Sequence, residues 1–164
     1  SFEQSHFLDG FGHGGRFRFA AAWGRDDMPS LPDYWEVIEA ATEETPFRLI
    51  TPPSRHFLNS TFGDTPTSRA QAGRPTVLVH DDDAARLGIA EGSKVRLGNR
   101  RGSVVVHARP TDGIAHGVVA VEGVWPNEDF VEGIGINRLV GSSPVLPAGG
   151  AAFHDVAVWI RGEA

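Results

Sequence analysis

Alternating hydrophobic and polar residues over most of the chain after Pro46 predict short β-strands that are separated by turns. Alternation of this kind is typical of strands with one buried face. The expected strands are residues 47–51, 76–80, 93–98, 103–108, 117–121 and 155–161. In the last of them, Val156, Val158 and Ile160 fall on one face. The sequence shows neither a long internal repeat nor alternation of strands with helices, so a mostly β fold is predicted, and a closed barrel best protects strand edges.

Between these strands the sequence predicts one short helix, a hairpin turn and a long loop. The helix is expected at residues 81–87, with an Asp as its cap and Gly88 at its end. Residues 99–102 (Asn-Arg-Arg-Gly) are typical of a hairpin turn. Residues 52–75 have few aliphatic side chains but many Ser, Thr, Arg and Asn residues. We therefore expect a long loop there, of the kind that carries function.

The N-terminal part of the chain has a different pattern from the rest. It contains a turn-rich stretch, a basic–aromatic alternation, a linker with two prolines and a possible helix, at residues 9–15, 16–19, 28–33 and 34–41. We expect residues 1–45 to form an extended segment laid over another surface. Residues 46–164 are then predicted to form the barrel domain.

Composition narrows the possible functions. The 164 residues include 20 glycines and 11 prolines, which favour frequent turns over long helices. The net charge of −6 argues against nonspecific binding to nucleic acid or anionic lipid. The absence of cysteine excludes disulfides, iron–sulfur ligation and a thiol nucleophile within this chain.

The ends of the sequence bear on its origin and location. The chain begins with Ser1 and not with Met, so we expect a processed product or a part of a longer protein. No apolar run is long enough for a transmembrane helix, and the first residues lack the pattern of a signal peptide. A cytoplasmic location is expected, and a periplasmic one stays open, because an export signal would precede this sequence.

Two motifs have simpler interpretations than the ligand sites that they suggest. The residues Gly10 to Gly15 match G-x-G-x-x-G, but the basic–aromatic stretch that follows predicts a strand where a dinucleotide site needs a helix. The residues His80 to Asp83 could bind a metal, but carboxylates are also common at helix N-termini, and helix capping is predicted. None of the seven histidines has a partner at helical spacing, so no metal site is predicted.

The loop after the first predicted strand is the strongest candidate for a binding site. It offers cationic or protonatable groups, hydroxyls, an amide and an aromatic ring, in Thr51, Ser54, Arg55, His56, Phe57, Asn59, Ser60 and Thr61. Arginine suits an anion, the amide and hydroxyls suit the edges of a heterocycle, and Phe57 could stack on it. The alternative is a surface loop that binds nothing.

Two further segments contain glycines beside polar or aromatic residues. In residues 132–139, Gly133 and Gly135 allow a ligand to approach the backbone, and Asn137 could bind a ring amide. In residues 149–155, a glycine turn leads to Phe153 and His154 before the last strand. Each segment taken alone is also compatible with an ordinary turn.

The order of these segments resembles the C-terminal molybdopterin-dinucleotide-binding domain of the dimethyl sulfoxide reductase family of molybdenum oxidoreductases. The resemblance runs from about Pro46 to Arg161. It rests on Leu-Ile-Thr-Pro-Pro-Ser-Arg-His-Phe-Leu-Asn-Ser-Thr from Leu49, on the block from Val79 to Leu97, on Gly-Ile-Asn-Arg-Leu from Gly135, and on Ala-Phe-His-Asp-Val-Ala-Val from Ala152. It implies a six-stranded double-psi β-barrel that binds the molybdopterin guanine dinucleotide cofactor.

The resemblance also implies cofactor-contacting residues, by position in the matching segments. These are Thr51, Ser54, Arg55, His56, Asn59, Ser60, Asn137, Phe153 and His154. Many members of the family have Lys where this chain has His154. No catalytic residue and no metal ligand is expected here, because the resemblance places the metal-ligating side chain and the iron–sulfur cysteines in other parts of the larger polypeptide.

The function implied is cofactor binding and orientation within a larger oxidoreductase, with no turnover by this chain alone. The expected partners are the other domains of that enzyme, with no nucleic acid and no membrane insertion. One alternative is a free-standing barrel that acts as an adaptor or small subunit. A second is a self-processing decarboxylase-like barrel, whose Gly-Ser cleavage could use residues 92–93, 102–103 or 141–142.

Overall fold

The structure, a computed structural model, describes residues 31, 38–145, 150–154 and 156–163. The chain divides into two compact units, of which the larger comprises Val37–Ser143 and Ala151–Ala164. The other comprises Ser1–Glu36 and Pro144–Gly150, and few of its residues are described. The loop and strand expected within residues 9–19 therefore lie outside the described residues.

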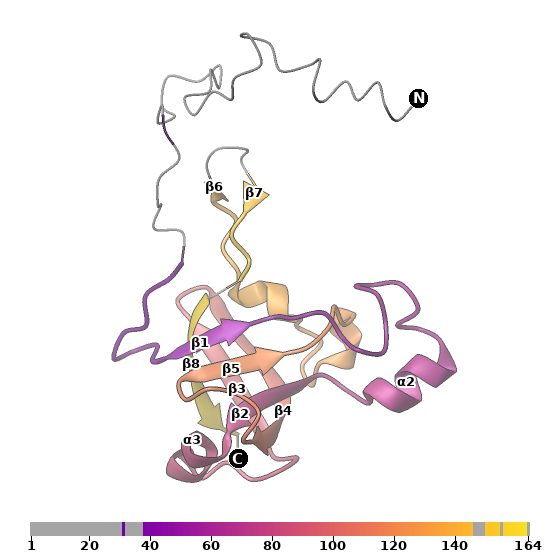
Figure 1. Cartoon of the computed structure of the whole chain (residues 1–164), viewed down its shortest axis with the longest axis horizontal. Coiled ribbons are helices and arrows are strands. Elements are labelled where there is room, and N and C mark those ends of the chain that lie inside the picture. The colour runs from indigo at the N-terminus through magenta and orange to yellow at the C-terminus, as the bar shows by residue number, and fades with distance from the viewer. Residues whose placement is uncertain (1–30, 32–37, 146–149, 155, 164) are drawn as a thin grey trace, which may run out of the picture. The chain divides into compact units, whose positions relative to one another are not determined.

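Six strands of the larger unit form a closed barrel in the order β1-β5-β2-β4-β3-β8, and β8 closes it against β1 (Figure 1). The strands are β1 (Phe47–Ile50), β2 (Thr76–His80), β3 (Lys94–Asn99), β4 (Gly102–Thr111), β5 (Val118–Val121) and β8 (Val156–Gly162). The prediction of a mostly β, six-stranded closed barrel is confirmed.

Two strand pairs in the barrel are parallel, β1 with β5 and β2 with β4. The other neighbours are antiparallel. Strand β5 lies between β1 and β2, so the connection from β1 to β2 crosses β5. Likewise β2 lies between β4 and β5, so the connection from β4 to β5 crosses β2. This interlocking makes the fold the double-psi β-barrel that was expected from the sequence.

The barrel core is built from β-branched and aliphatic side chains on alternate strand positions. Val77 and Val79 on β2 and Val104 and Val106 on β4 are fully buried. The predicted apolar face of β8 is confirmed, since Val156, Val158 and Ile160 are all buried. Burial of such side chains supplies the main stabilisation, because each buried valine or isoleucine contributes about 1.5–3 kcal/mol relative to an exposed one.

The helices differ in part from the prediction. Helix α3 (Asp81–Leu87) and its end at Gly88 are confirmed, but its cap is the His80 side chain, whose Nδ1 accepts a hydrogen bond from the Asp82 N–H at 3.1 Å. No Asp caps it, because the three aspartates already lie inside the first turn. Residues 38–41 are not helical, and the remainder of the helix expected at 34–41 lies outside the described residues.

Helix α2 (Pro66–Ala72) was not predicted, since residues 52–75 were expected to form a loop throughout. Thr65 caps the start of α2, and Pro66 occupies its first turn. None of its residues is buried, so the sequence shows no apolar periodicity that would predict this helix. Two 3₁₀ turns, η1 (Asn127–Asp129) and η2 (Ile136–Leu139), follow β5.

Two further strands, β6 (Pro144–Val145) and β7 (Gly150–Ala151), form a separate two-stranded sheet. Among the residues that the structure describes, no helix combines the length and the hydropathy that crossing a membrane requires.

Candidate functional site

The candidate site begins where two parallel strands end. Because β1 and β5 are parallel, the loops that follow them leave the barrel at the same edge (Figure 1). The backbone joins the two loops, since the Gly123 N–H donates to the Pro52 carbonyl at 2.8 Å. Gly123 has φ +86° and lies against the Phe57 ring, so a side chain there would clash. The two loops are therefore closely packed against each other where they leave the barrel.

A cleft of about 240 Å³, here called the first cleft, lies at this edge. It is lined by the β1 loop, the segment after β5, the η2 turn and the turn before β8. Five of the nine residues predicted to contact the cofactor line it: Thr51, Asn59, Asn137, Phe153 and His154. The structure thus brings together three segments that are far apart in the sequence.

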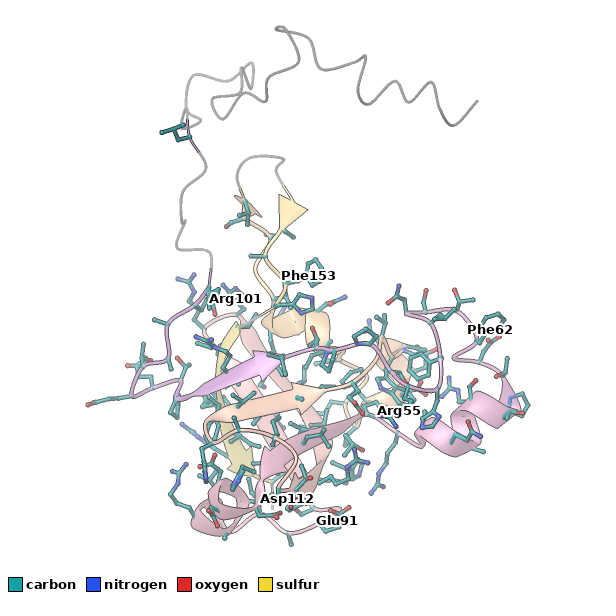
Figure 2. All side chains as sticks on the ribbon, in the orientation of Figure 1. Arg55, Phe62, Glu91, Arg101, Asp112 and Phe153 are labelled. Atoms are coloured by element: carbon teal, nitrogen blue, oxygen red, sulfur yellow. The ribbon has the colours of Figure 1, made fainter. Side chains whose placement is uncertain are left out.

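Two of these segments are joined directly. The Thr51 hydroxyl lies 3.3 Å from Nδ1 of His154, at hydrogen-bond distance. The rings of His154 and Phe153 have their centroids 4.5 Å apart. Phe153, labelled in Figure 2, is half exposed, so part of its ring is accessible to a ligand.

Hydrogen bonds to η2 fix the position of Asn137. The Leu139 carbonyl accepts from the Asn99 side-chain amide at 2.8 Å and from Arg101 at 3.1 Å. Arg101 also pairs with the carboxylate of Glu39, which accepts from the Ala157 N–H at 3.0 Å. The Arg101 hydrogen bond holds the pKa of Glu39 below its ordinary value, although burial opposes it. The floor of the first cleft is therefore tied to β3 and β8.

Asn59 and Ser60 form the tip of a tight turn in the β1 loop. Leu58 and Thr61 exchange two backbone hydrogen bonds, of 3.1 and 2.6 Å. Asn59 has φ +48°, a left-handed conformation that asparagine tolerates well. Asn59 lines the first cleft, whereas Ser60 is exposed and is not among the residues that line it.

Phe57 does not have the predicted role of a stacking surface. Its side chain is only 6% exposed, and its ring meets Trp125 edge to face at a centroid distance of 5.2 Å. An aromatic pair of this geometry anchors a loop by burial. Phe57 is therefore a structural residue, because the β1 loop folds back over its own apolar side chain.

Three of the four remaining predicted residues, all except Ser60, line a second cleft of about 290 Å³. Ser54, Arg55 and His56 meet there the polar and charged residues Gln71, Arg74, Thr76, Arg109 and Glu122. Trp125 lines both clefts and donates from its indole to the Glu122 carbonyl at 2.8 Å. Three arginines and one glutamate give the second cleft a local excess of positive charge in an acidic chain.

Several lining residues were not predicted from the sequence. Trp125 and Asn127 belong to the first cleft, and Arg74 and Arg109 to the second. Gly123 and Trp125 directly follow the buried strand β5. They could have signalled the first-cleft residues Trp125 and Asn127, but only once β5 is known to be parallel to β1. No local signal marks Arg74 and Arg109. Only the pairing of β2 with β4 brings the strand that carries Arg109 beside the strand that Arg74 precedes.

Comparison with known proteins identifies the family. Residues 47–157 match the family model described as "Molydopterin dinucleotide binding domain". Among curated proteins, the chain is 30% identical over 84% of its length to "Probable oxidoreductase YoaE" of Bacillus subtilis. It is 32% identical over 87% of its length to "Dimethyl sulfoxide reductase DmsA" of Escherichia coli. The expected resemblance to the dimethyl sulfoxide reductase family is confirmed.

The matched proteins are much longer than this chain, which spans 20% of the Bacillus protein and 19% of the Escherichia one. Among solved structures, acetylene hydratase from Pelobacter acetylenicus superposes on 80% of the chain with a TM-score of 0.65 at 14% identity. The chain covers 21% of that structure, and the likeness shows a shared fold. The family match covers most of the barrel, and its cofactor is the one that the sequence predicts. The chain therefore belongs to the family of molybdopterin dinucleotide-binding domains.

Proposed function

We propose that this chain binds and orients a molybdopterin guanine dinucleotide as a domain of a larger molybdenum-dependent oxidoreductase, and that it has no turnover alone. One observation carries the proposal. Thr51, Asn59, Asn137, Phe153 and His154, taken from three separate segments, line a single cleft. An ordinary set of surface turns has no reason to converge in this way.

The donors in the two clefts suit the chemistry of this cofactor. The first cleft offers the amides of Asn59 and Asn137 for the edges of a heterocycle, and an open Phe153 face for stacking. Gly135 packs closely against Asn127, since a side chain there would strike the Asn127 amide, and this holds Asn127 at the cleft. The arginines of the second cleft suit the charges of a pyrophosphate. The residues present therefore fit a ligand with both heterocyclic and anionic parts.

The division of labour follows from these groups. The cofactor, when bound, supplies two-electron redox chemistry at its metal, commonly with oxygen-atom transfer. Arg55 holds negative charge, and Asn59 and Asn137 fix the orientation of the ring edges. Trp125 and Phe57 keep the loop rigid from beneath. A bound group that is held at several points in this way loses little additional freedom during reaction.

The proposed partners are the remaining domains of the parent enzyme, in a cytoplasmic setting. The lengths of the relatives support this, since the chain spans about a fifth of each of the two named above. Residues 46–164 are proposed as the cofactor-binding domain, and residues 1–45 as a segment that precedes it. A native mass several times 17.6 kDa, measured with an antibody against this chain, is the expected result. A native mass near 17.6 kDa would favour a free-standing adaptor or small subunit.

The site itself is tested in the full parent enzyme with Asn137→Ala and Arg55→Ala. Each variant is expected to lose about tenfold or more in cofactor affinity, as the loss of a buried or charged hydrogen bond predicts. The readouts are molybdenum per polypeptide and guanine nucleotide released by hydrolysis, with urea unfolding as the measure of fold stability.

Thr67→Ala is the matched control, because Thr67 lies in the same connection between β1 and β2, is exposed, and is not among the residues lining the two clefts. It should retain wild-type molybdenum content. Wild-type content in both Asn137→Ala and Arg55→Ala would overturn the assignment of these clefts to the cofactor.

A further inference from the structure

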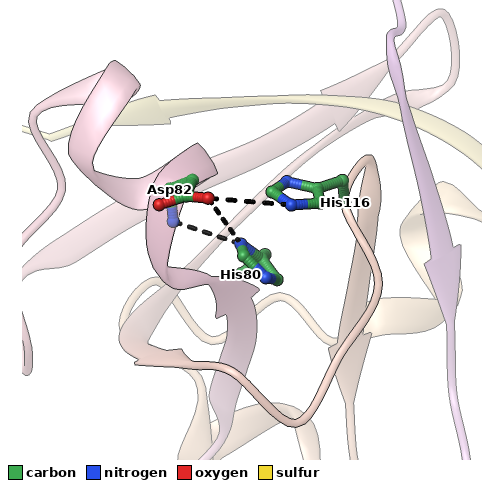
Figure 3. A group of neighbouring side chains, drawn as sticks. All are labelled: His80, Asp82 and His116. Carbon is green, nitrogen blue, oxygen red and sulfur yellow. Dashed lines mark hydrogen bonds and ion pairs between the residues drawn. The ribbon is translucent and has the colours of Figure 1, made fainter.

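A group of histidine and aspartate side chains lies where β2 and β4 end. His80 is the last residue of β2 and pairs in register with Thr111, the last residue of β4. Since these strands are parallel, the segments that follow them leave the barrel at the same edge. This brings His116, from the connection between β4 and β5, beside His80 and Asp82 (Figure 3).

The three side chains nearly meet at one point. Nε2 of His116 lies 3.7 Å from Oδ2 of Asp82, and Nδ1 of His80 lies 4.0 Å from the same oxygen. One nitrogen or oxygen from each residue falls within 4.8 Å of the others. A tetrahedral ion with bonds of about 2.0–2.2 Å holds its ligand atoms roughly 3.3 Å apart. Small side-chain rotations would therefore bring all three atoms onto one ion.

The two imidazoles are stacked, with centroids 3.6 Å apart and planes tilted by 36°. The Asp82 carboxylate adds negative charge beside them, and its side chain is largely exposed to solvent. An ion could thus enter the group without opening the core.

Asp83 occupies the position of an orienting carboxylate. Its Oδ2 lies 3.9 Å from Nδ1 of His116, beyond hydrogen-bond distance, while Nε2 of the same ring faces Asp82. Asp83 is itself fixed, since it accepts from the Gly117 N–H and from Arg86, each at 2.8 Å, and is only 6% exposed. A carboxylate facing the second ring nitrogen is the usual support of a metal-binding histidine.

We propose that His80, Asp82 and His116 bind a divalent transition-metal ion of the zinc class, with water completing its coordination. Two nitrogens and one carboxylate oxygen suit zinc or cobalt, whereas calcium and magnesium prefer oxygen ligands. The ion replaces the 3.1 Å hydrogen bond that His80 Nδ1 now accepts from the Asp82 N–H. Binding would tie the connection between β4 and β5 to the start of α3.

The test is calorimetric titration of the full chain with Zn²⁺ after chelator treatment. One ion per chain is expected, and Asp82→Asn and His116→Ala should each weaken binding at least about tenfold. His80→Asn should do the same while keeping a residue that can cap α3. Asp81→Asn is the matched control, because Asp81 is an exposed neighbouring carboxylate outside the group. It should bind Zn²⁺ as the wild type does.

Cobalt gives an independent readout, because visible absorption of bound Co²⁺ reports mixed nitrogen and oxygen coordination. The wild type and Asp81→Asn should show this absorption, and His116→Ala should lose it. Thermal melting without metal establishes that each variant is folded. If His80→Asn does not fold, the loss of metal binding in His116→Ala alone tests the proposed site. No Zn²⁺ binding by the wild type, or equal binding by all three variants through other histidines, would overturn the proposal.

Discussion

The indole of Trp159 on β8 occupies the space that a side chain at Gly98 on β3 would need. The two residues are register partners, and the Arg161 guanidinium lies 4.6 Å from the centroid of the indole. Gly98 is thus required by close approach, since its own φ does not lie in the left-handed region. The pair lies where the last strand packs against β3, one of its two neighbours in the barrel.

Gly98→Ala should therefore destabilise the fold. The added methyl group must displace a large ring within a paired strand, and such overpacking costs about 1–3 kcal/mol. The free energy of unfolding in urea measures the effect. Gly162→Ala is the control, because Gly162 lies on β8 in the same strand pair and a side chain there meets nothing within 4 Å. Its stability should stay within about 0.5 kcal/mol of the wild type.

Phe57→Ala should lower the free energy of unfolding by about 3–5 kcal/mol, because it leaves a cavity at a buried position against Trp125. Chemical unfolding of the full chain is the measurement. Phe62→Ala provides the comparison within the same loop, since Phe62 is 56% exposed, and the loss there should be below about 1 kcal/mol. Equal losses in the two variants would contradict the structural role assigned to Phe57.

Asp83→Asn should lower stability in a pH-dependent way. Burial raises the pKa of Asp83, but hydrogen bonds from Arg86 and Gly117 outweigh it and hold the pKa below its ordinary value. The ionised form is thus favoured by folding, so its contribution is complete above roughly pH 4 and is lost as the pH falls further.

At neutral pH the free energy of unfolding of the wild type should exceed that of Asp83→Asn by about 1–3 kcal/mol, the value of hydrogen bonds to a charged group. Urea unfolding at neutral and at acidic pH should show the gap closing at low pH. Asp81→Asn, which changes an exposed carboxylate on the same helix, should show no such gap. A gap that is constant with pH would point to packing as its cause.

Val105→Asp should prevent stable folding, because Val105 on β4 is 2% exposed and the new carboxylate would have no water. An uncompensated buried charge costs about 3–5 kcal/mol, a large part of the stability of a domain. Circular dichroism and soluble yield would register the loss. Val131→Asp places the same group at a 40% exposed position, and that variant should fold normally.

The barrel strands could be predicted because their signal is local. Val77 and Val79, or Val158 and Ile160, alternate with less buried positions on a pleated strand, and this period is visible in the sequence. Helix α2 could not be predicted in the same way, since it buries none of its residues and begins at a proline. The cap of α3 was misassigned because histidine is an uncommon capping residue, while the aspartates beside it are common ones.

The candidate site was predicted in part, for a related reason. Polar residues next to glycine or proline marked the β1 loop and Asn137, but their convergence depends on which strands are parallel. Phe57 was misjudged because an aromatic residue among polar ones has the same sequence pattern whether its ring faces a ligand or Trp125. The approach of His80 and His116 likewise arises from strand pairing alone.

Strand β1 has both of its barrel neighbours, β5 and β8, much later in the chain. During synthesis the ribosome therefore releases β1 and the loop that follows it long before either supporting strand exists. Contacts between such distant segments form late, because closing a long loop must precede them. The cleft is complete only after Val158 has emerged and paired with Phe47. A ligand of this cleft can therefore bind only after translation of this domain, on a barrel that is already closed.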